Sequence, residues 1–226
     1  MSSPLRGRPA ALVLAAGLLL AGCGGGGDSG GTQVSDAGAA HSHTSAPAQV
    51  TGGDGGSYAG IDLDPPYQRP SFTLTDSSGA SYDFRSATAG RPTLLFFGYT
   101  NCPDVCPTTM ADIAVALRGM DPVVAATVQV VFVTTDPARD TPPVLGAYLD
   151  QFDSDLPTSF IGLTGDQTAI DQAQLSAGVP LAEEGGQVHS SLLLLYGSDD
   201  KAHDAFDAGN TSRDIASDLE LVAAGK

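Results

Sequence analysis

Two cysteines, Cys102 and Cys106, lie four residues apart in the segment Tyr99–Met110, and a proline follows each of them. A spacing of four places both side chains on one face of a helical turn, about 5–6 Å apart at Cβ. At that distance the two sulfurs can bind one metal ion or, with local adjustment, form a disulfide. A helix N-terminus also favours the thiolate, which is the form of cysteine that binds metals and attacks disulfides. Pro107 suits the first turn of such a helix.

Two thiolates alone make an incomplete metal site, and His189 is the natural third ligand. It directly precedes the apolar segment Ser190–Tyr196, whose start is expected to lie against the cysteine loop. Two soft sulfur donors and one imidazole suit copper, either as Cu(I) or as Cu(II) with an additional weak ligand. The competing interpretations are a structural disulfide or packed thiols for Cys102 and Cys106, and a surface or core position for the histidine.

The elements that position these residues follow from the hydrophobic pattern. Continuous apolar runs at Thr93–Tyr99 and Val128–Val133 are typical of strands covered on both faces. Apolar residues at helical spacing predict helices between and after them. The remaining expected elements are strands at 160–163, 190–196 and 202–206, and helices at 108–120, 143–152, 166–177 and 211–224.

Strands that alternate with helices predict parallel pairing, while a late hairpin adds antiparallel strands. Phe72–Thr75 and Ser81–Phe84, joined by a glycine-containing turn, predict a further hairpin near the start of the domain. The expected architecture is therefore α/β and thioredoxin-like, a mixed central sheet flanked by helices with an extra N-terminal β-hairpin. The cysteines would stand at the carboxyl end of the first long strand, where open α/β sheets form their sites. His203 is expected at the surface of an edge strand.

Residues 1–22 have the three parts of a secretory signal peptide: Arg6 and Arg8, an apolar run over 10–20, and small residues before Cys23. The run is shorter than the ~20 residues that a membrane-spanning helix needs. Leu20–Cys23 resembles the bacterial lipobox, which predicts cleavage before Cys23 and acylation of its thiol. We therefore expect a lipoprotein of the cell membrane that faces the extracytoplasmic side and is held by its lipid anchor alone.

Residues 23–57 are expected to form a flexible, lipid-anchored tether, because they are rich in Gly, Ser, Ala and Thr and contain no aromatic residue. A coil of that length reaches on the order of 30 Å. His41 and His43 lie in this segment and are expected to be solvated linker residues, although a histidine pair can collect metal loosely. The folded domain is expected over residues 58–226.

The charge of the chain excludes one large class of function. Acidic residues outnumber basic ones 26 to 10 over 226 residues, for a formal net charge of −16. Removal of residues 1–22 would leave 8 basic and 26 acidic residues, a charge of −18. Nucleic-acid binding needs a basic surface that releases counterions, so no nucleic-acid partner is expected. Such a negative charge instead favours docking to a basic partner.

Three motifs, in this order, resemble the Sco/SenC family. They are FGYTNCPDVCP at Phe97–Pro107, VTTDPARDTP at Val133–Pro142 and VHSS at Val188–Ser191, within a resemblance that covers roughly residues 65–224.

The resemblance implies a thioredoxin-like fold and a copper ion bound by two cysteines and a histidine, which fall on Cys102, Cys106 and His189. It implies one of two roles at the CuA centre in subunit II of cytochrome c oxidase. As a metallochaperone the protein would deliver copper there. As a thiol–disulfide oxidoreductase it would keep the CuA-site cysteines reduced while Cys102 and Cys106 cycle through a disulfide. Another extracytoplasmic copper chaperone or a thiol reductant would be a further partner.

The histidine separates these two roles, because trigonal copper needs an imidazole ligand and a redox helper does not. The CxxxC spacing also suits chelation better than the usual CxxC of redox proteins. Many family members carry Asp immediately before the histidine, where this chain has Val188. Asp136 ends a strand on the cysteine side, so it could support the site or cap the following turn, and the structural role is the favoured interpretation.

Overall fold

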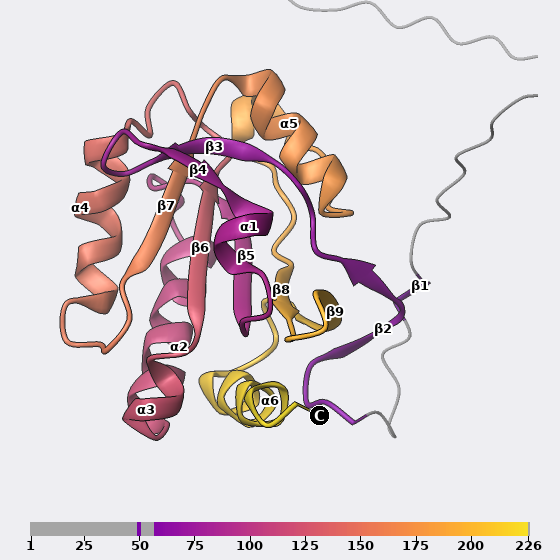
Figure 1. Cartoon of the computed structure of the whole chain (residues 1–226). Coiled ribbons are helices and arrows are strands. Elements are labelled where there is room, and N and C mark those ends of the chain that lie inside the picture. The colour runs from indigo at the N-terminus through magenta and orange to yellow at the C-terminus, as the bar shows by residue number, and fades with distance from the viewer. Residues whose placement is uncertain (1–48, 51–56, 226) are drawn as a thin grey trace, which may run out of the picture. The chain divides into compact units, whose positions relative to one another are not determined.

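The computed structural model describes residues 49–50 and 57–225 (Figure 1). The expected signal peptide, Cys23, His41 and His43 lie outside the described residues. The strands are β1 (Gln49–Val50), β2 (Ile61–Gln68), β3 (Thr73–Asp76), β4 (Ser81–Asp83), β5 (Thr93–Gly98), β6 (Gln129–Thr134), β7 (Phe160–Thr164), β8 (Leu193–Tyr196) and β9 (Lys201–Phe206). The helices are α1 (Phe84–Thr88), α2 (Val105–Gly119), α3 (Pro122–Ala125), α4 (Pro142–Asp153), α5 (Gln167–Ser176) and α6 (Ser212–Ala223), with a 3₁₀ turn at Glu184–Gly186.

In the described part of the chain the strands form one mixed sheet in the order β1-β2-β9-β8-β5-β6-β7-β3-β4. Strands β5, β6 and β7 run parallel, and the hairpin β8–β9 joins them through an antiparallel pairing of β8 with β5. The hairpin β3–β4 adds to the far side through antiparallel pairing of β3 with β7. The expected thioredoxin-like fold with an extra N-terminal hairpin is confirmed.

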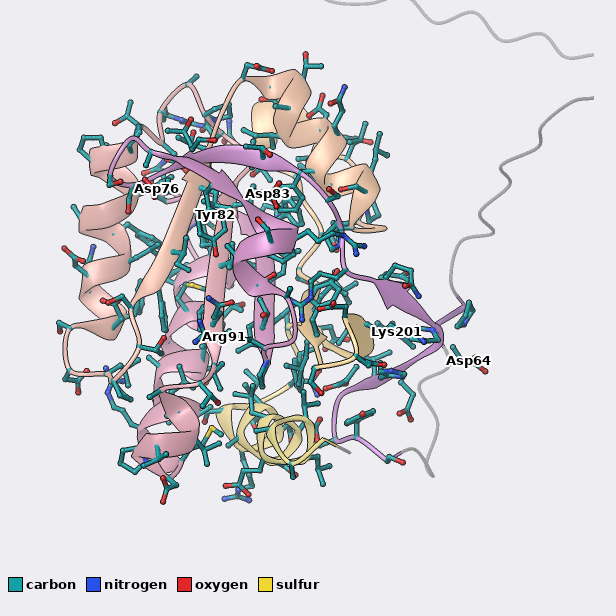
Figure 2. All side chains as sticks on the ribbon, in the orientation of Figure 1. Asp64, Asp76, Tyr82, Asp83, Arg91 and Lys201 are labelled. Carbon is teal, nitrogen blue, oxygen red and sulfur yellow. The ribbon has the colours of Figure 1, made fainter. Side chains whose placement is uncertain are left out.

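Strand β5 is buried at every position because helices and their side chains cover both faces of the sheet (Figure 2). Leu94 and Phe96 face the core formed with α2, α4 and α6, whereas Leu95 and Phe97 face the core formed with α1 and α5. This two-sided burial explains why the sequence shows an unbroken apolar run rather than an alternating pattern. No helix in the described ranges combines the length and apolar character that crossing a bilayer requires.

Strand β2 was not predicted, and it changes the position of β9. It pairs antiparallel with β9, so β9 lies inside the sheet and the prediction that His203 sits on an edge strand is wrong. The side chain of His203 is nevertheless partly exposed, and its Nε2 lies 2.8 Å from a carboxylate oxygen of Asp199. The sequence of β2, IDLDPPYQ, concealed the strand because two prolines and two acids are unfavourable in a regular ladder.

Arg69, which follows β2, is fully buried and is the largest side chain of the interior. Its Nε donates to the Asp200 carboxylate at 2.7 Å, and its guanidinium lies 5.0 Å from the centre of the Tyr196 ring. The four remaining N–H donors reach oxygen atoms at 2.9 Å on Thr88, Thr93, Arg91 and Gly197. Every donor of the guanidinium is therefore satisfied, and one side chain joins β2, α1, β5 and the β8–β9 turn.

A second buried polar group, Asp204 on β9, meets Asp218 of α6 beneath the first described residues of the domain. Asp218 accepts hydrogen bonds from the backbone N–H groups of Ala59 at 2.9 Å and Gly60 at 2.8 Å, which stabilise its negative charge. Burial, followed by the negative charge of Asp218, raises the pKa of Asp204 to about 9. Asp204 is therefore the protonated partner of the pair at neutral pH.

We expect Asp204→Asn to stabilise the protein near pH 8. The folded state holds a proton on Asp204 that the unfolded chain releases from its ordinary pKa near 4 upward, so stability falls as pH rises toward 9. Asparagine has nearly the same shape and no proton to lose, so the variant avoids this loss. Thermal unfolding at pH 5 and pH 8 measures the effect, and an unchanged pH dependence in the variant would contradict the assignment.

Candidate metal centre

Cys102, Cys106 and His189 come together at the carboxyl end of β5. Their sulfur and nitrogen atoms all lie within 4.8 Å of one another, and Cys106 Sγ is 3.4 Å from His189 Nε2. With metal–ligand bonds of about 2.0–2.3 Å, two ligands of one ion lie at most about 4.6 Å apart. A small side-chain movement therefore suffices to close all three around one metal ion. Both cysteines are free thiols here, so the disulfide between them stays a prediction.

Cys102 lies in the loop just before α2, where the helix begins earlier than the expected residue 108. The N–H groups of a first helical turn have no intrahelical acceptor, and that of Cys106 donates to Cys102 Sγ at 3.4 Å. Burial works to raise the pKa of Cys102, but the N–H groups of Cys106 and Asp104 outweigh it, and the pKa is lowered. Cys102 is therefore the thiol that ionises first.

Cys106 is fully buried in the first turn of α2. Burial, together with the neighbouring Cys102 sulfur and the negative charge of Asp140, raises the pKa of Cys106. In the metal-free protein Cys106 therefore keeps its proton, and its Sγ lies 3.4 Å from His189 Nε2. A metal ion that binds here must displace this proton, so metal binding at Cys106 releases a proton to solvent.

The tautomer of His189 leaves the correct nitrogen free for a metal. Nδ1 lies 2.8 Å from the carbonyl oxygen of Ser190, which can only accept, so Nδ1 carries the ring hydrogen. The lone pair of Nε2 then points toward the sulfurs. Phe96 and Tyr99 hold the ring in edge-on contacts at 6.0 and 5.6 Å between ring centres. Fixing a metal-binding histidine through its second nitrogen and through packing is typical of metal sites.

We expect iodoacetamide at pH 7 to modify Cys102 at least about tenfold faster than Cys106, because the thiolate is the reacting form. Cys102 is partly exposed with a lowered pKa, whereas Cys106 is buried with a raised one. Mass spectrometry of peptides after timed quenching measures both rates. Cys102→Ser should remove the fast phase, and equal modification of the two thiols would contradict the assigned ionisation order.

The loop before His189 is fixed by one close backbone contact. Gly186 has a φ of +92°, and a Cβ there would lie 2.1 Å from the carbonyl oxygen of Thr135. The Thr135 hydroxyl donates to the Gly186 carbonyl at 2.7 Å, and Glu183 N–H donates to the Val188 carbonyl at 2.7 Å. Val188 acts through its backbone and its side chain is exposed, so the loop needs no side chain at that position to present the histidine.

Asp140 is the residue that joins the cysteine loop to the neighbouring strand. It is buried and accepts hydrogen bonds from Thr100 N–H at 2.9 Å, Thr100 Oγ1 at 2.6 Å and Thr134 Oγ1 at 2.6 Å. The sequence motif contained this aspartate, but only the fold shows that it reaches back across β6 to the residue two before Cys102. The sequence signal that could have predicted this contact is a threonine shortly before the cysteines together with an acidic residue after the next strand.

Asp136 stays with its own turn instead of the cysteines. Its carboxylate accepts from Arg139 Nε at 2.5 Å, and its carbonyl accepts from the N–H groups of Arg139 and Asp140. Its own N–H donates to the Thr134 hydroxyl at 3.0 Å. These contacts agree with the structural role favoured from the sequence.

A family model described as SCO1/SenC matches residues 63–224, which include all three ligand candidates and the motifs around them. The chain belongs to the SCO1/SenC family. Protein SenC of Rhodobacter capsulatus is 40% identical over 107 residues, which are 45% of this chain and 43% of SenC. The chain spans between 33% and 64% of the first curated relatives that it matches.

Two solved Sco structures are similar to this Sco/SenC chain. The copper-bound structure of Bradyrhizobium japonicum ScoI is 34% identical with a TM-score of 0.57, and the match covers 69% of this chain and 99% of ScoI. BsSco, described as a cytochrome c oxidase assembly protein with a disulfide switch, is 28% identical with a TM-score of 0.55, and the match covers 71% and 96%. The family expected from the sequence motifs is therefore confirmed.

Proposed function

We propose that this Sco/SenC protein binds one copper ion through Cys102, Cys106 and His189 and delivers it to the CuA centre of cytochrome c oxidase subunit II. The observation that carries the proposal is the convergence of two sulfurs with an imidazole nitrogen whose lone pair faces them. Two thiolates and one imidazole form a soft donor set that suits copper. The copper-bound relative from Bradyrhizobium supports the choice of metal.

A second function, thiol–disulfide exchange, is favoured by the unequal cysteines. Cys102 is partly exposed with a lowered pKa, as an attacking thiol requires. Cys106 is buried and its sulfur lies within 4.8 Å of the Cys102 sulfur, as a resolving thiol requires. In this role the reduced pair would give two electrons to a disulfide in the CuA site and become oxidised itself. The disulfide switch of BsSco supports this alternative.

Two reactions with the soluble domain of subunit II separate the functions. In the first, the Cu(I)-loaded protein meets the reduced, copper-free domain, and copper is measured in each protein after they are separated. In the second, the reduced, copper-free protein meets a domain whose CuA cysteines are oxidised, and the free thiols of that domain are counted after the two proteins are separated. Copper transfer in the first reaction is the expected result. Reduction of the CuA disulfide without copper transfer would support the oxidoreductase role instead of copper delivery.

We further propose that residues 1–22 are removed, that Cys23 is acylated, and that residues 23–57, apart from the strand β1 at Gln49–Val50, tether the domain at the extracytoplasmic face of the cell membrane. The pattern of a basic start, an apolar run and LAGC supports this location. Cys23→Ser should move the protein from the membrane fraction to the soluble extracytoplasmic fraction or leave its signal uncleaved. Unchanged membrane retention with normal processing would contradict lipid anchoring.

We expect Gly186→Ala to lower Cu(I) affinity about 10–100-fold, the range typical of disturbed outer-shell partners. A methyl group there collides with the Thr135 carbonyl and pushes the His189 loop outward. Gly185→Ala is the matched control, because Gly185 also has a positive φ of +67° but has no atom within 4 Å of the place where the new methyl group would lie. Chelator competition measures both affinities. Equal losses in the two variants would assign the effect to backbone strain rather than to the contact.

A further inference from the structure

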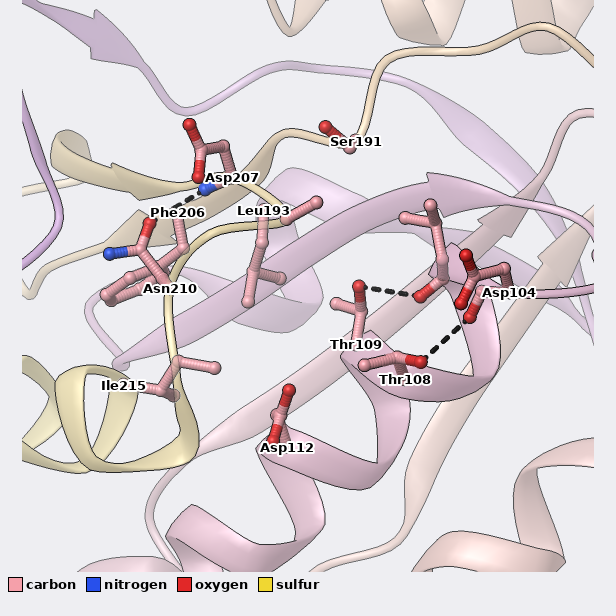
Figure 3. Close-up of a pocket in the computed structure, with 12 residues that line it drawn as sticks. Asp104, Thr108, Thr109, Asp112, Ser191, Leu193, Phe206, Asp207, Asn210 and Ile215 are labelled. Atoms are coloured by element: carbon pink, nitrogen blue, oxygen red, sulfur yellow. Dashed lines mark hydrogen bonds between the residues drawn. The ribbon is translucent and has the colours of Figure 1, made fainter.

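A pocket opens between α2, the start of β8 and the loop that joins β9 to α6 (Figure 3). Its volume is about 130 Å³. Pockets for cofactors and other small molecules usually measure about 300–1,000 Å³, so this one has the scale of a single long side chain. It belongs to neither the cysteine pair nor the histidine, and none of the three ligand candidates lines it.

The floor of the pocket is apolar. Leu193, Phe206 and Ile215 line it and are buried, and they come from β8, β9 and α6 (Figure 3). On the α2 side, the hydroxyls of Thr108 and Thr109 donate to the backbone carbonyls one turn earlier, at 2.9 and 3.0 Å. These hydroxyl hydrogens are therefore not available to a ligand, and the pocket presents an apolar surface bordered by oxygen atoms.

Three carboxylates, those of Asp104, Asp112 and Asp207, line the same pocket, and no lysine or arginine lines it. None of the three takes part in an ion pair within the described ranges. Asp112 accepts a hydrogen bond from the N–H of Ser212, and Asp207 accepts one from Gly209 at 2.7 Å. These hydrogen bonds leave the negative charge uncompensated by any neighbouring cation.

The position of the pocket connects it with metal exchange. Asp104 lies between the two cysteines in sequence, and Ser191 lies two residues after His189, so the pocket begins where both ligand-bearing loops end. A protein whose thiols approach Cys102 would therefore come close to this opening.

We propose that the pocket receives a lysine or arginine side chain of the protein that exchanges copper with this centre. The methylene stem would pack on Leu193, Phe206 and Ile215, and the cationic group would meet the carboxylates at the rim. The inference rests on the proposed function and adds the chemistry of the partner: a basic side chain placed beside its metal-accepting thiols. The net charge of −18 that remains after removal of residues 1–22 would attract such a partner, and the pocket would set its orientation.

The rate of Cu(I) transfer to the soluble domain of subunit II tests the proposal. The test variant is Asp112→Asn/Asp207→Asn, which keeps the acceptor oxygens for the Ser212 and Gly209 N–H groups and removes two charges. The matched control is Asp150→Asn/Asp171→Asn, which removes two charges from α4 and α5, away from the pocket. We expect the test variant to transfer copper about fivefold more slowly at low salt and the control to stay within about twofold of the parent.

Cu(I) affinity, measured by chelator competition, should be the same in all three proteins, since none of the four aspartates contacts the metal ligands. Equal slowing in both double variants would contradict the role of the pocket, because the effect would then come from the overall charge of the molecule alone. No slowing in either would overturn it as well. Failure of the proposed function has a different signature, because the parent protein itself would then bind no Cu(I) or transfer none.

Discussion

Replacing Cys106 with serine is expected to lower the Cu(I) affinity by more than about a hundredfold, beyond the usual 10–100-fold cost of losing an outer-shell partner. Cys106 Sγ lies 3.4 Å from His189 Nε2, and the ligand atoms of Cys102, Cys106 and His189 all lie within 4.8 Å of one another. A serine hydroxyl fits the same space but is a hard oxygen donor that Cu(I) binds poorly. Competition with a Cu(I) chelator under reducing conditions measures the loss.

Two histidine variants complete this experiment. His189→Ala should weaken Cu(I) binding strongly, because it leaves two sulfurs without the nitrogen ligand. His203→Ala is the control, since His203 is partly exposed and pairs with Asp199 instead of the cysteines. Parent-like affinity in either Cys106→Ser or His189→Ala would remove that residue from the proposed ligand set.

Arg69→Ala is expected to destabilise the fold by about 3–4 kcal/mol. The substitution removes a buried guanidinium that satisfies Asp200 and four further oxygen atoms, and buried acceptors left without partners are costly. It also leaves a cavity beside Tyr196. Urea-induced unfolding, followed by circular dichroism, measures the change.

Arg213→Ala is the control for the loss of an arginine, because Arg213 is exposed on α6 and should change stability by no more than about 0.5 kcal/mol. The same experiment with Arg69→Met separates packing from hydrogen bonding, since methionine fills most of the space. Full stability of Arg69→Met would show that the hydrogen bonds of Arg69 contribute nothing net to folding.

The central strands could be predicted from sequence because their residue types alone indicate that both faces are buried. Thr93–Gly98 and Gln129–Thr134 are runs of β-branched and large apolar side chains that only a sheet covered on both faces can bury. Because the cysteines directly follow the first of these runs, they could be assigned to the carboxyl end of that strand. The histidine followed because its loop leads into β8, the neighbour of β5.

The rest depended on contacts between distant segments. Strand β2 contains two prolines and gains its place only by pairing with β9, more than a hundred residues later. Arg69 belongs to a residue type that is almost always exposed, and its burial requires acceptors from two distant stretches of the chain, residues 88–93 and 197–200. Asp140 likewise gains its role only when β6 brings it beside Thr100. Local sequence carries no signal for such pairings.

The central claim is a copper centre of two sulfurs and one nitrogen, and its most direct test is Cu(I) titration of the reduced protein against a competing chelator, with X-ray absorption of the product. We predict one tightly bound equivalent per chain, with two sulfur ligands and one nitrogen ligand in the spectrum. The nitrogen contribution should disappear in His189→Ala. Absence of tight binding in the parent protein, or an unchanged spectrum in His189→Ala, would contradict the assignment of this centre.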